Sequence, residues 1–160
     1  MVCQKLWPKG KRLITIKFLD NTDIFNIKTQ AFAHGVNAKG LTGGLAKEFE
    51  NRFPKSIEQY RLKLRTSEIT GGDIIVVFEN SYWIYNLVIQ IDPGANSKIE
   101  FIEMSLKKMI IHAKNNAINV MSLPKLGCGI GGLQWREVKE IYDSVLKPET
   151  SITFNVCSLL

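Results

Sequence analysis

The sequence predicts an α/β fold, a three-layer α/β/α sandwich built around a mixed sheet. Three observations predict it: strand-length apolar runs alternate with amphipathic helical segments, a hairpin interrupts this alternation near the middle, and two glycine-rich turns each lie between a strand and a helix. Strands that alternate with helices form parallel sheets covered on both faces, and a hairpin adds an antiparallel pair. With 160 residues, no repeat and no low-complexity linker, we expect residues 1–160 to form one domain.

The first half of the chain is expected to contain two strands and two helices. Alternating apolar and polar residues predict the first strand, which ends at Asp20-Asn21, and a short apolar run predicts the second. Apolar residues at helical spacing follow the first glycine turn, and Pro54 is expected to end that helix. The expected elements are strands 13–19 and 30–36, then helices 45–53 and 57–65.

The second half begins with two strands joined like a hairpin at Asn80-Ser81. The longest helix follows a Pro-Gly loop, and Ser97 with Glu100 three residues later predicts a capping box at its start. Pro148 lies just beyond the last helix. The expected elements are strands 73–79 and 82–91, helix 97–116, strand 118–123, helix 133–146 and strand 151–159.

Composition narrows the class of protein. Hydrophobic residues make up 45% and charged residues 22%, as is ordinary for a soluble domain, and no apolar run is long enough to cross a membrane or to serve as a signal peptide. Cys3, Cys128 and Cys157 form no CxxC pair, which favours a reducing compartment. We therefore expect a cytoplasmic protein with no membrane partner. Two histidines and scattered cysteines lack metal-site spacing, so no metal or cofactor is expected.

The two glycine-rich turns, residues 37–44 and 126–132, are the main functional signal. Both follow expected strands and precede expected helices, so they lie at the carboxyl ends of strands, where ligands of such sheets bind. Glycine lets backbone N–H groups approach a phosphate closely, beside the positive end of a helix dipole. No GxxxxGK[ST] pattern is present, and no GxGxxG pattern follows the first strand with an acidic residue at the required later position. Two such loops suggest a ligand with two phosphates, such as a nucleotide diphosphate sugar. The net charge of +6 also favours an anionic partner.

Two segments carry a resemblance to a known family. Residues 32–46 read FAHGVNAKGLTGGLA, with RFP at 52–54, and residues 123–135 read LPKLGCGIGGLQW. They resemble the two ligand loops of the macro domain. The residue pattern is closest to that of one branch of the family. This branch contains the terminal ADP-ribose protein glycohydrolases, the ADP-ribose-1''-phosphate phosphatases and the macro-domain antitoxins that reverse DNA ADP-ribosylation. The resemblance spans nearly the whole chain and implies a cleft that binds ADP-ribose.

The resemblance also implies positions for ADP-ribose in the cleft. Asp23 would accept a hydrogen bond from the adenine amino group with Ile24 beside the ring, although Asp20 can be aligned to the same role. Asn37 would approach the distal ribose. The pyrophosphate would lie between the loops, with the backbone of Gly43, Gly44 and Leu45 on one side and Gly129, Ile130, Gly131 and Gly132 on the other. Thr42, Pro124, Gly127 and Cys128 would also contact the ligand.

Two positions depart from the glycohydrolase pattern. Gln90 stands where that branch has a lysine and Gly131 where it has an aspartate, so no amine is available for a Schiff base on opened ribose. His34 matches a histidine of the phosphatase branch, and a histidine can act as nucleophile or general acid–base on a phosphomonoester. The alternative is a buried strand histidine. We therefore expect His34 and Asn37 to be catalytic in an ADP-ribose 1''-phosphate phosphatase.

Two other functions remain open at this point. One is a non-catalytic reader or sink for ADP-ribose, which the missing lysine and aspartate favour. The other is a hydrolase that removes ADP-ribose from a modified protein or nucleic acid.

Overall fold

The computed structural model describes residues 15–159, and their six strands form one mixed sheet in the order β1-β6-β5-β2-β4-β3. All neighbouring strands are parallel except β3 and β4, which form the expected antiparallel hairpin. The strands are β1 (Ile16–Asp20), β2 (Ala31–Asn37), β3 (Ile74–Glu79), β4 (Tyr82–Gln90), β5 (Val120–Pro124) and β6 (Thr153–Ser158). The mixed sheet predicted from the sequence is confirmed.

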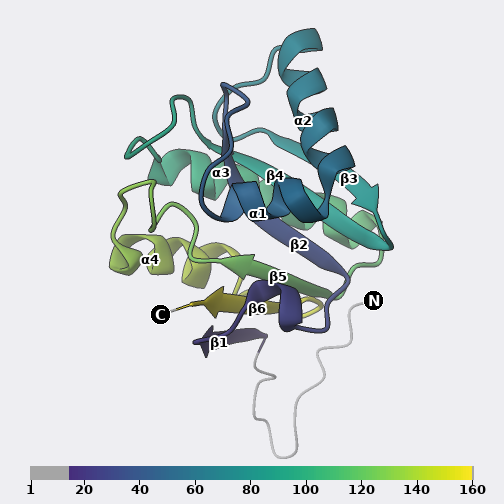
Figure 1. Ribbon diagram of the computed structural model, residues 1–160. Coiled ribbons are helices and arrows are strands. Elements are labelled where there is room, and N and C mark those ends of the chain that lie inside the picture. Colours follow the sequence, from purple (N-terminus) through teal and green to yellow (C-terminus); the bar gives the residue numbers. More distant parts are fainter. Residues whose placement is uncertain (1–14, 160) are drawn as a thin grey trace, which may run out of the picture.

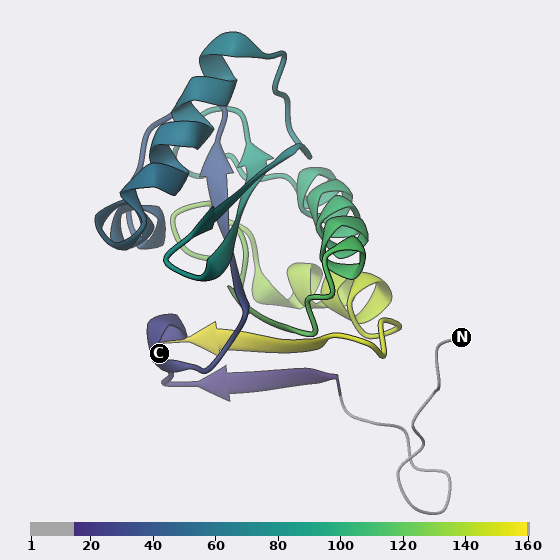
Figure 2. The same ribbon diagram turned by 90° about the vertical axis from the view of Figure 1, so that its right-hand side faces the viewer.

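Helices cover both faces of this sheet (Figures 1 and 2). Helices α1 and α2 lie on one face, and α3 and α4 lie on the other. Their bounds are α1 (Leu45–Arg52), α2 (Pro54–Thr66), α3 (Ile99–Asn115) and α4 (Trp135–Val145), with a short 3-10 helix η2 (Ile24–Asn26) before β2. The three-layer sandwich is therefore confirmed as well. None of the helices within residues 15–159 combines the length and the apolar character needed to span a bilayer.

The central strand β2 is buried on both faces, which explains its nearly continuous apolar sequence. Phe32 and Val36 pack toward α1 and α2, whereas Ala31 and Ala33 face the larger core under α3 and α4. Phe49 of α1 is fully buried against Phe32. Truncating such a side chain to alanine costs about 3–5 kcal/mol. This packing holds α1, and with it the first glycine loop, against the end of β2.

The start of α2 differs from the sequence prediction. Pro54 does not only end α1; it is the first residue of α2, where its missing N–H is not needed. Glu79, at the end of β3, accepts hydrogen bonds from the backbone N–H groups of Lys55 at 3.1 Å and Ser56 at 2.9 Å. A buried carboxylate therefore caps α2 from another element, which no local pattern could reveal.

The start of α3 also differs. The expected capping box is wrong, because Lys98 is the N-cap residue and no side chain caps the helix. The hydroxyl of Ser97 instead donates to Oε1 of Gln90, 2.6 Å away. The side chain of Ser97 thus binds the end of β4 and does not cap α3.

Candidate functional site

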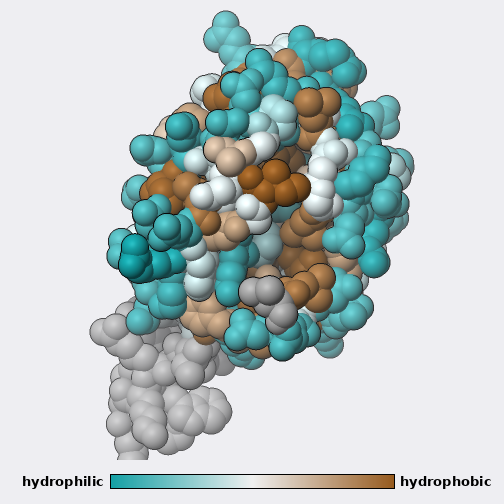
Figure 3. Space-filling view, turned by 60° about the vertical axis from the view of Figure 1, so that its left-hand side comes forward, coloured by the Kyte–Doolittle hydropathy of each residue, from teal (hydrophilic) through white to brown (hydrophobic). Residues whose placement is uncertain are grey.

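Both glycine loops line one cleft at the carboxyl edge of the sheet. We call residues 37–44 loop 1 and residues 126–132 loop 2; they follow β2 and β5. The cleft has a volume of about 450 Å³. In Figure 3, which brings this edge forward, pale and hydrophobic residues surround a hollow and hydrophilic residues ring them. The lining residues are Gly35, Val36, Asn37, Leu41, Thr42, Gly43, Gly44, Leu45, Ala46, Gln90, Pro93, Gly94, Pro124, Lys125, Gly129, Ile130 and Gly131.

Backbone N–H groups without a partner are the main polar feature of this cleft. On one side, residues 42–46 donate no backbone N–H to any described residue, and neither do residues 129–131 on the other. Every one of these residues lines the cleft. Residues 45 and 46 also begin α1, so the positive end of its dipole adds to the field. Unpaired N–H groups on two sides suit an anion with several oxygens.

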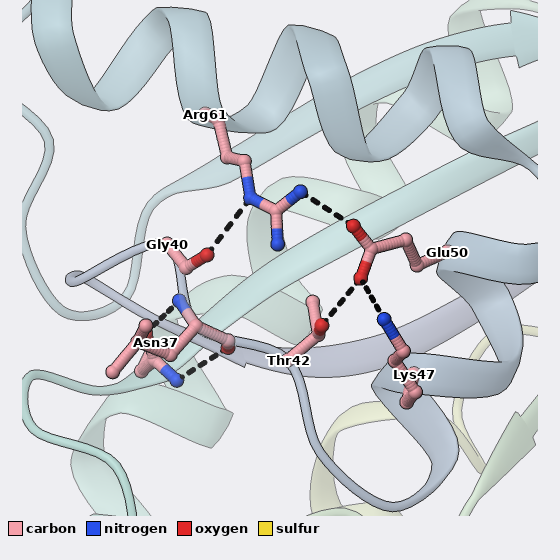
Figure 4. A network of polar contacts seen from close by, with 7 residues as sticks. Asn37, Gly40, Thr42, Lys47, Glu50 and Arg61 are labelled. Carbon is pink, nitrogen blue, oxygen red and sulfur yellow. Dashed lines mark hydrogen bonds and ion pairs between the residues drawn. The ribbon is translucent and has the colours of Figure 1, made fainter.

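Loop 1 is held by the side chain of Asn37. Its Oδ1 accepts hydrogen bonds from the backbone N–H groups of Lys39 at 3.0 Å and Leu41 at 3.2 Å, and its Nδ2 donates to the carbonyl of Leu41 at 2.9 Å. The hydroxyl of Tyr60 donates to the carbonyl oxygen of Asn37. Asn37 is therefore committed at both ends of its amide to shaping the loop (Figure 4).

An ionic network fixes the far side of loop 1 (Figure 4). Glu50 of α1 accepts from the hydroxyl of Thr42 at 2.6 Å and pairs with Arg61 of α2, whose Nε donates to the carbonyl of Gly40 at 2.9 Å. Lys47 also contacts the same carboxylate. The hydrogen bonds from Thr42 and then Arg61 lower the pKa of Glu50 to about 2. The network ties loop 1 to both helices, so the loop is preorganised.

Loop 2 is anchored from below by Tyr142 of α4. Its hydroxyl donates to the carbonyl of Pro124 and accepts the N–H of Leu126 at 3.0 Å. Gly131 is held from the side, since its carbonyl accepts the N–H of Ser97 at 3.2 Å. A Cβ atom at Gly131 would lie 2.2 Å from Oγ of Ser97 and 2.8 Å from the carbonyl oxygen of Gly127. Only glycine therefore fits at this position without displacing its neighbours.

The two loops also approach each other across the cleft. Ile130, at the tip of loop 2, is 65% exposed, and a Cβ atom on Gly44 would lie 3.1 Å from its Cδ1. Gly44 has a positive φ of 54°, a region that side chains disfavour. The loops are thus close enough for one ligand to contact both.

Most of the predicted ligand-binding residues line this cleft. They are Asn37, Thr42, Gly43, Gly44, Leu45, Pro124, Gly129, Ile130 and Gly131. The structure does not bring Gly127, Cys128 and Gly132 to the cleft surface, because they form the turns that shape loop 2 from behind. Cys128 also lies well before the start of α4, and burial raises the pKa of its thiol to about 11, so no stabilised thiolate forms there.

Asp23 and Ile24 lie outside the cleft lining. Asp23 is the N-cap of η2, and its Oδ1 accepts the N–H of Phe25 at 3.0 Å. Ile24 is only 4% exposed and packs in the core under η2. Asp20 ends β1 on the same edge of the sheet. The contact of Asp23, or alternatively of Asp20, with the adenine therefore stays a prediction.

His34 lies in the core rather than in the cleft, which argues against the catalytic role expected for it. Its ring is 1% exposed and stacks on Phe49 with the centroids 4.0 Å apart. Nε2 donates to Oδ1 of Asn86 at 2.7 Å, since the Nδ2 of Asn86 is occupied by Ser56 and Ile75. Nδ1 is buried without a partner among residues 15–159, and burial lowers the pKa of His34 to about 4. The structure thus has His34 as a buried strand histidine, and a catalytic role for it stays a prediction.

Two lining residues were not expected from the sequence. Among the described residues, Lys125, just before loop 2, is the one titratable side chain in the lining. Gln90, which stands at the lysine position of the glycohydrolase branch, is only 9% exposed and lines the cleft. The described residues also contain no group of three or more histidine, cysteine or acidic side chains suited to a metal ion.

Several known proteins are similar to this chain in sequence. The human ADP-ribose glycohydrolase OARD1 is 27% identical over 154 residues, which are 95% of each chain. The DNA ADP-ribosyl glycohydrolase of Mycobacterium tuberculosis is 29% identical over 123 residues, which are 74% of this chain but 35% of that protein. The ADP-ribose 1''-phosphate phosphatase of Lodderomyces elongisporus is 22% identical over 142 residues, covering 81% of this chain and 86% of that one.

A solved structure and a family profile agree with these relatives. The macrodomain of Mycobacterium tuberculosis DarG superposes with a TM-score of 0.79 at 25% identity, covering 88% of this chain and 97% of that one. The Macro domain profile matches residues 33–142, which include both loops and most of the helix that follows loop 2. The chain therefore belongs to the macro domain family.

Proposed function

We propose that this chain binds ADP-ribose, free or as part of a larger molecule, with the pyrophosphate between loops 1 and 2. The single observation that supports it best is the set of unpaired backbone N–H groups that line both sides of one cleft. A pyrophosphate offers acceptor oxygens to both sides at once, and a single anion would engage only one. Lys125 adds a positive charge without a carboxylate in the lining.

We orient the proposed ligand along the order of the strands in the sheet. β1, with Asp20 at its end, lies at one side of the sheet, and β4, with Gln90 at its end, lies four strand spacings away. With strands about 4.8 Å apart, this separation is roughly 19 Å. Adenine near β1, pyrophosphate over the loops from β5 and β2, and the distal ribose near β4 is the arrangement we propose.

Hydrolysis at the distal ribose is a second candidate, favoured because the three relatives described above are named as glycohydrolases or as a phosphatase. ADP-ribose 1''-phosphate is the leading substrate, because His34 matches a histidine of the phosphatase branch and one relative is named an ADP-ribose 1''-phosphate phosphatase. The described lining contains no histidine or carboxylate, so catalysis would consist of holding the ligand and a water molecule in place. Asn37 would act by shaping loop 1.

Removal of ADP-ribose from modified nucleic acid or protein is a weaker alternative. The similarity to the DNA ADP-ribosyl glycohydrolase and the net charge of +6 favour nucleic acid. Against it, Gln90 offers no amine, and a side chain at Gly131 would collide with Ser97. A modified oligonucleotide bound more tightly than ADP-ribose, and much less tightly at higher salt, would favour this alternative.

Phosphorus NMR tests these functions together. Addition of the protein to ADP-ribose is expected to shift both pyrophosphate resonances of the ligand. Incubation of the protein with ADP-ribose 1''-phosphate would show whether inorganic phosphate accumulates. Phosphate release would establish the phosphatase, whereas shifted resonances without release would leave a reader or sink. Unchanged resonances at millimolar ligand would refute binding itself.

The proposal also covers the whole chain and its location. We propose that residues 1–160 act as one macro domain in the cytoplasm, which the free thiols of Cys128 and Cys157 support. Cell fractionation with a tagged chain is the direct test.

A further inference from the structure

The sugar end of the proposed cleft contains two side-chain amides, on Asn37 and Gln90. A register shift between Val36 and Asn37 brings Asn37 opposite Gln90 at the ends of β2 and β4. Both residues are at least nine-tenths buried and both line the cleft. They are the side chains best placed to meet a sugar hydroxyl at this end.

These two amides are not equally available. Asn37 uses both ends of its amide inside loop 1, as described above. Gln90 is bound only at Oε1, by the hydroxyl of Ser97, and its Nε2 has no partner among residues 15–159. A donor that is nearly buried, unpaired and open to a cleft is ready for a ligand oxygen.

Ser97 fixes the direction of this donor. Its hydroxyl holds Oε1 of Gln90, and its own N–H donates to the carbonyl of Gly131 in loop 2. The hydroxyl also occupies the space that a side chain at Gly131 would need. One serine therefore couples the end of β4 to loop 2 and turns the glutamine amide nitrogen toward the cleft.

We infer that Gln90 determines specificity for the distal sugar by donating its Nε2 hydrogen bonds to a hydroxyl of an intact ribose, with Ser97 as its positioning residue. The inference rests on the proposed function, because it assumes that the pyrophosphate lies between the loops. The group is neutral, so it recognises an uncharged sugar edge. The chemical class selected is a nucleoside diphosphate that carries a pentose, over the same nucleoside diphosphate without one.

Calorimetric titration with ADP-ribose and ADP tests the inference. Wild-type protein is expected to bind ADP-ribose more tightly than ADP. Gln90→Met keeps the side-chain volume but removes the amide, and we expect about fivefold weaker binding of ADP-ribose with ADP unchanged. Ser97→Ala should change the same ratio in the same direction by about threefold. Ser144→Ala is the matched control, because its hydroxyl bonds only within α4 to the carbonyl of Ile141.

The ratio of the two affinities separates the possible outcomes. A purely structural role for Gln90 would weaken both ligands equally and would overturn the inference, as would equal wild-type affinity for ADP-ribose and ADP. Failure of both ligands to bind would refute the proposed function instead. A second readout needs no variant: the side-chain amide resonances of Gln90 should shift with ADP-ribose and not with ADP, and a shift of equal size with both would contradict the inference.

Discussion

Acid should destabilise this protein through His34 at a pH where carboxylates are still ionised. The folded chain holds the ring in the core with a pKa near 4, whereas the ordinary value is 6.5. Between these values the unfolded chain binds a proton that the folded chain does not. The free energy of unfolding therefore falls as the pH drops from 6.5 toward 4.

The size of this effect follows from the shift. The full difference of roughly 2.5 pKa units corresponds to about 3 kcal/mol, and about 2 kcal/mol of it should be lost between pH 7 and pH 5. The lowered pKa of Glu50 changes the free energy of unfolding only below its ordinary pKa of 4.5, so Glu50 does not affect the comparison between pH 7 and pH 5. Burial also lowers the pKa of His112, so His112 too should reduce the free energy of unfolding as the pH falls. A variant of His112 is therefore needed as a control.

Urea unfolding at pH 7 and pH 5 measures the effect. His34→Gln is the test variant, because its amide can still donate to Asn86 but does not titrate. Between pH 7 and pH 5 the free energy of unfolding of the wild type should fall by about 2 kcal/mol more than that of this variant. The His112→Gln variant should still show most of the fall seen in the wild type. Equal losses in wild type and His34→Gln would refute the reasoning. An imidazole NMR titration with a midpoint above 6 would do the same, and would reopen a catalytic role for His34.

Three further predictions concern the cap of α2 and the cleft. Glu79→Gln should lower the free energy of unfolding by about 1 kcal/mol in urea titrations, because a weaker acceptor remains for the N–H groups that start α2. Gly44→Ala should weaken ADP-ribose binding about tenfold or more in calorimetry, since the positive φ and the contact with Ile130 both disfavour a methyl group. Lys125→Met should weaken binding about fivefold and reduce its dependence on salt; an unchanged salt dependence would exclude Lys125 from the phosphate site.

The fold was predictable because its signals are local and periodic. Strand alternation, helical spacing and the hairpin at Asn80-Ser81 identified the main elements and the mixed sheet, with errors of a few residues at the ends. The exceptions depend on distant contacts. Glu79 caps α2 from the end of β3, and Ser97 donates its hydroxyl to Gln90 instead of capping α3. No spacing rule within the chain encodes such contacts.

The binding site was predictable where it consists of backbone, and less so where it depends on side-chain direction. Glycine patterns located both loops at one edge of the sheet. The resemblance implied a catalytic role for His34, whereas the structure has its ring in the core, and its neighbours in the sequence already indicated that position. Phe32, His34 and Val36 alternate along β2, so they share a face, and the apolar residues on either side of His34 mark that face as core.

This contrast explains why binding is easier to infer for this chain than reaction. The proposed site for the pyrophosphate is made of N–H groups that any residue except proline supplies, provided that glycines such as Gly44 and Gly131 allow the loops their shape. Chemistry at the sugar depends instead on the ends of β2 and β4, where single substitutions change the functional group. At those ends this chain has a committed Asn37 and a neutral Gln90 fixed by Ser97. A domain can thus keep its ligand while its reaction changes, and the pair of Gln90 and Ser97 is where that change would be seen.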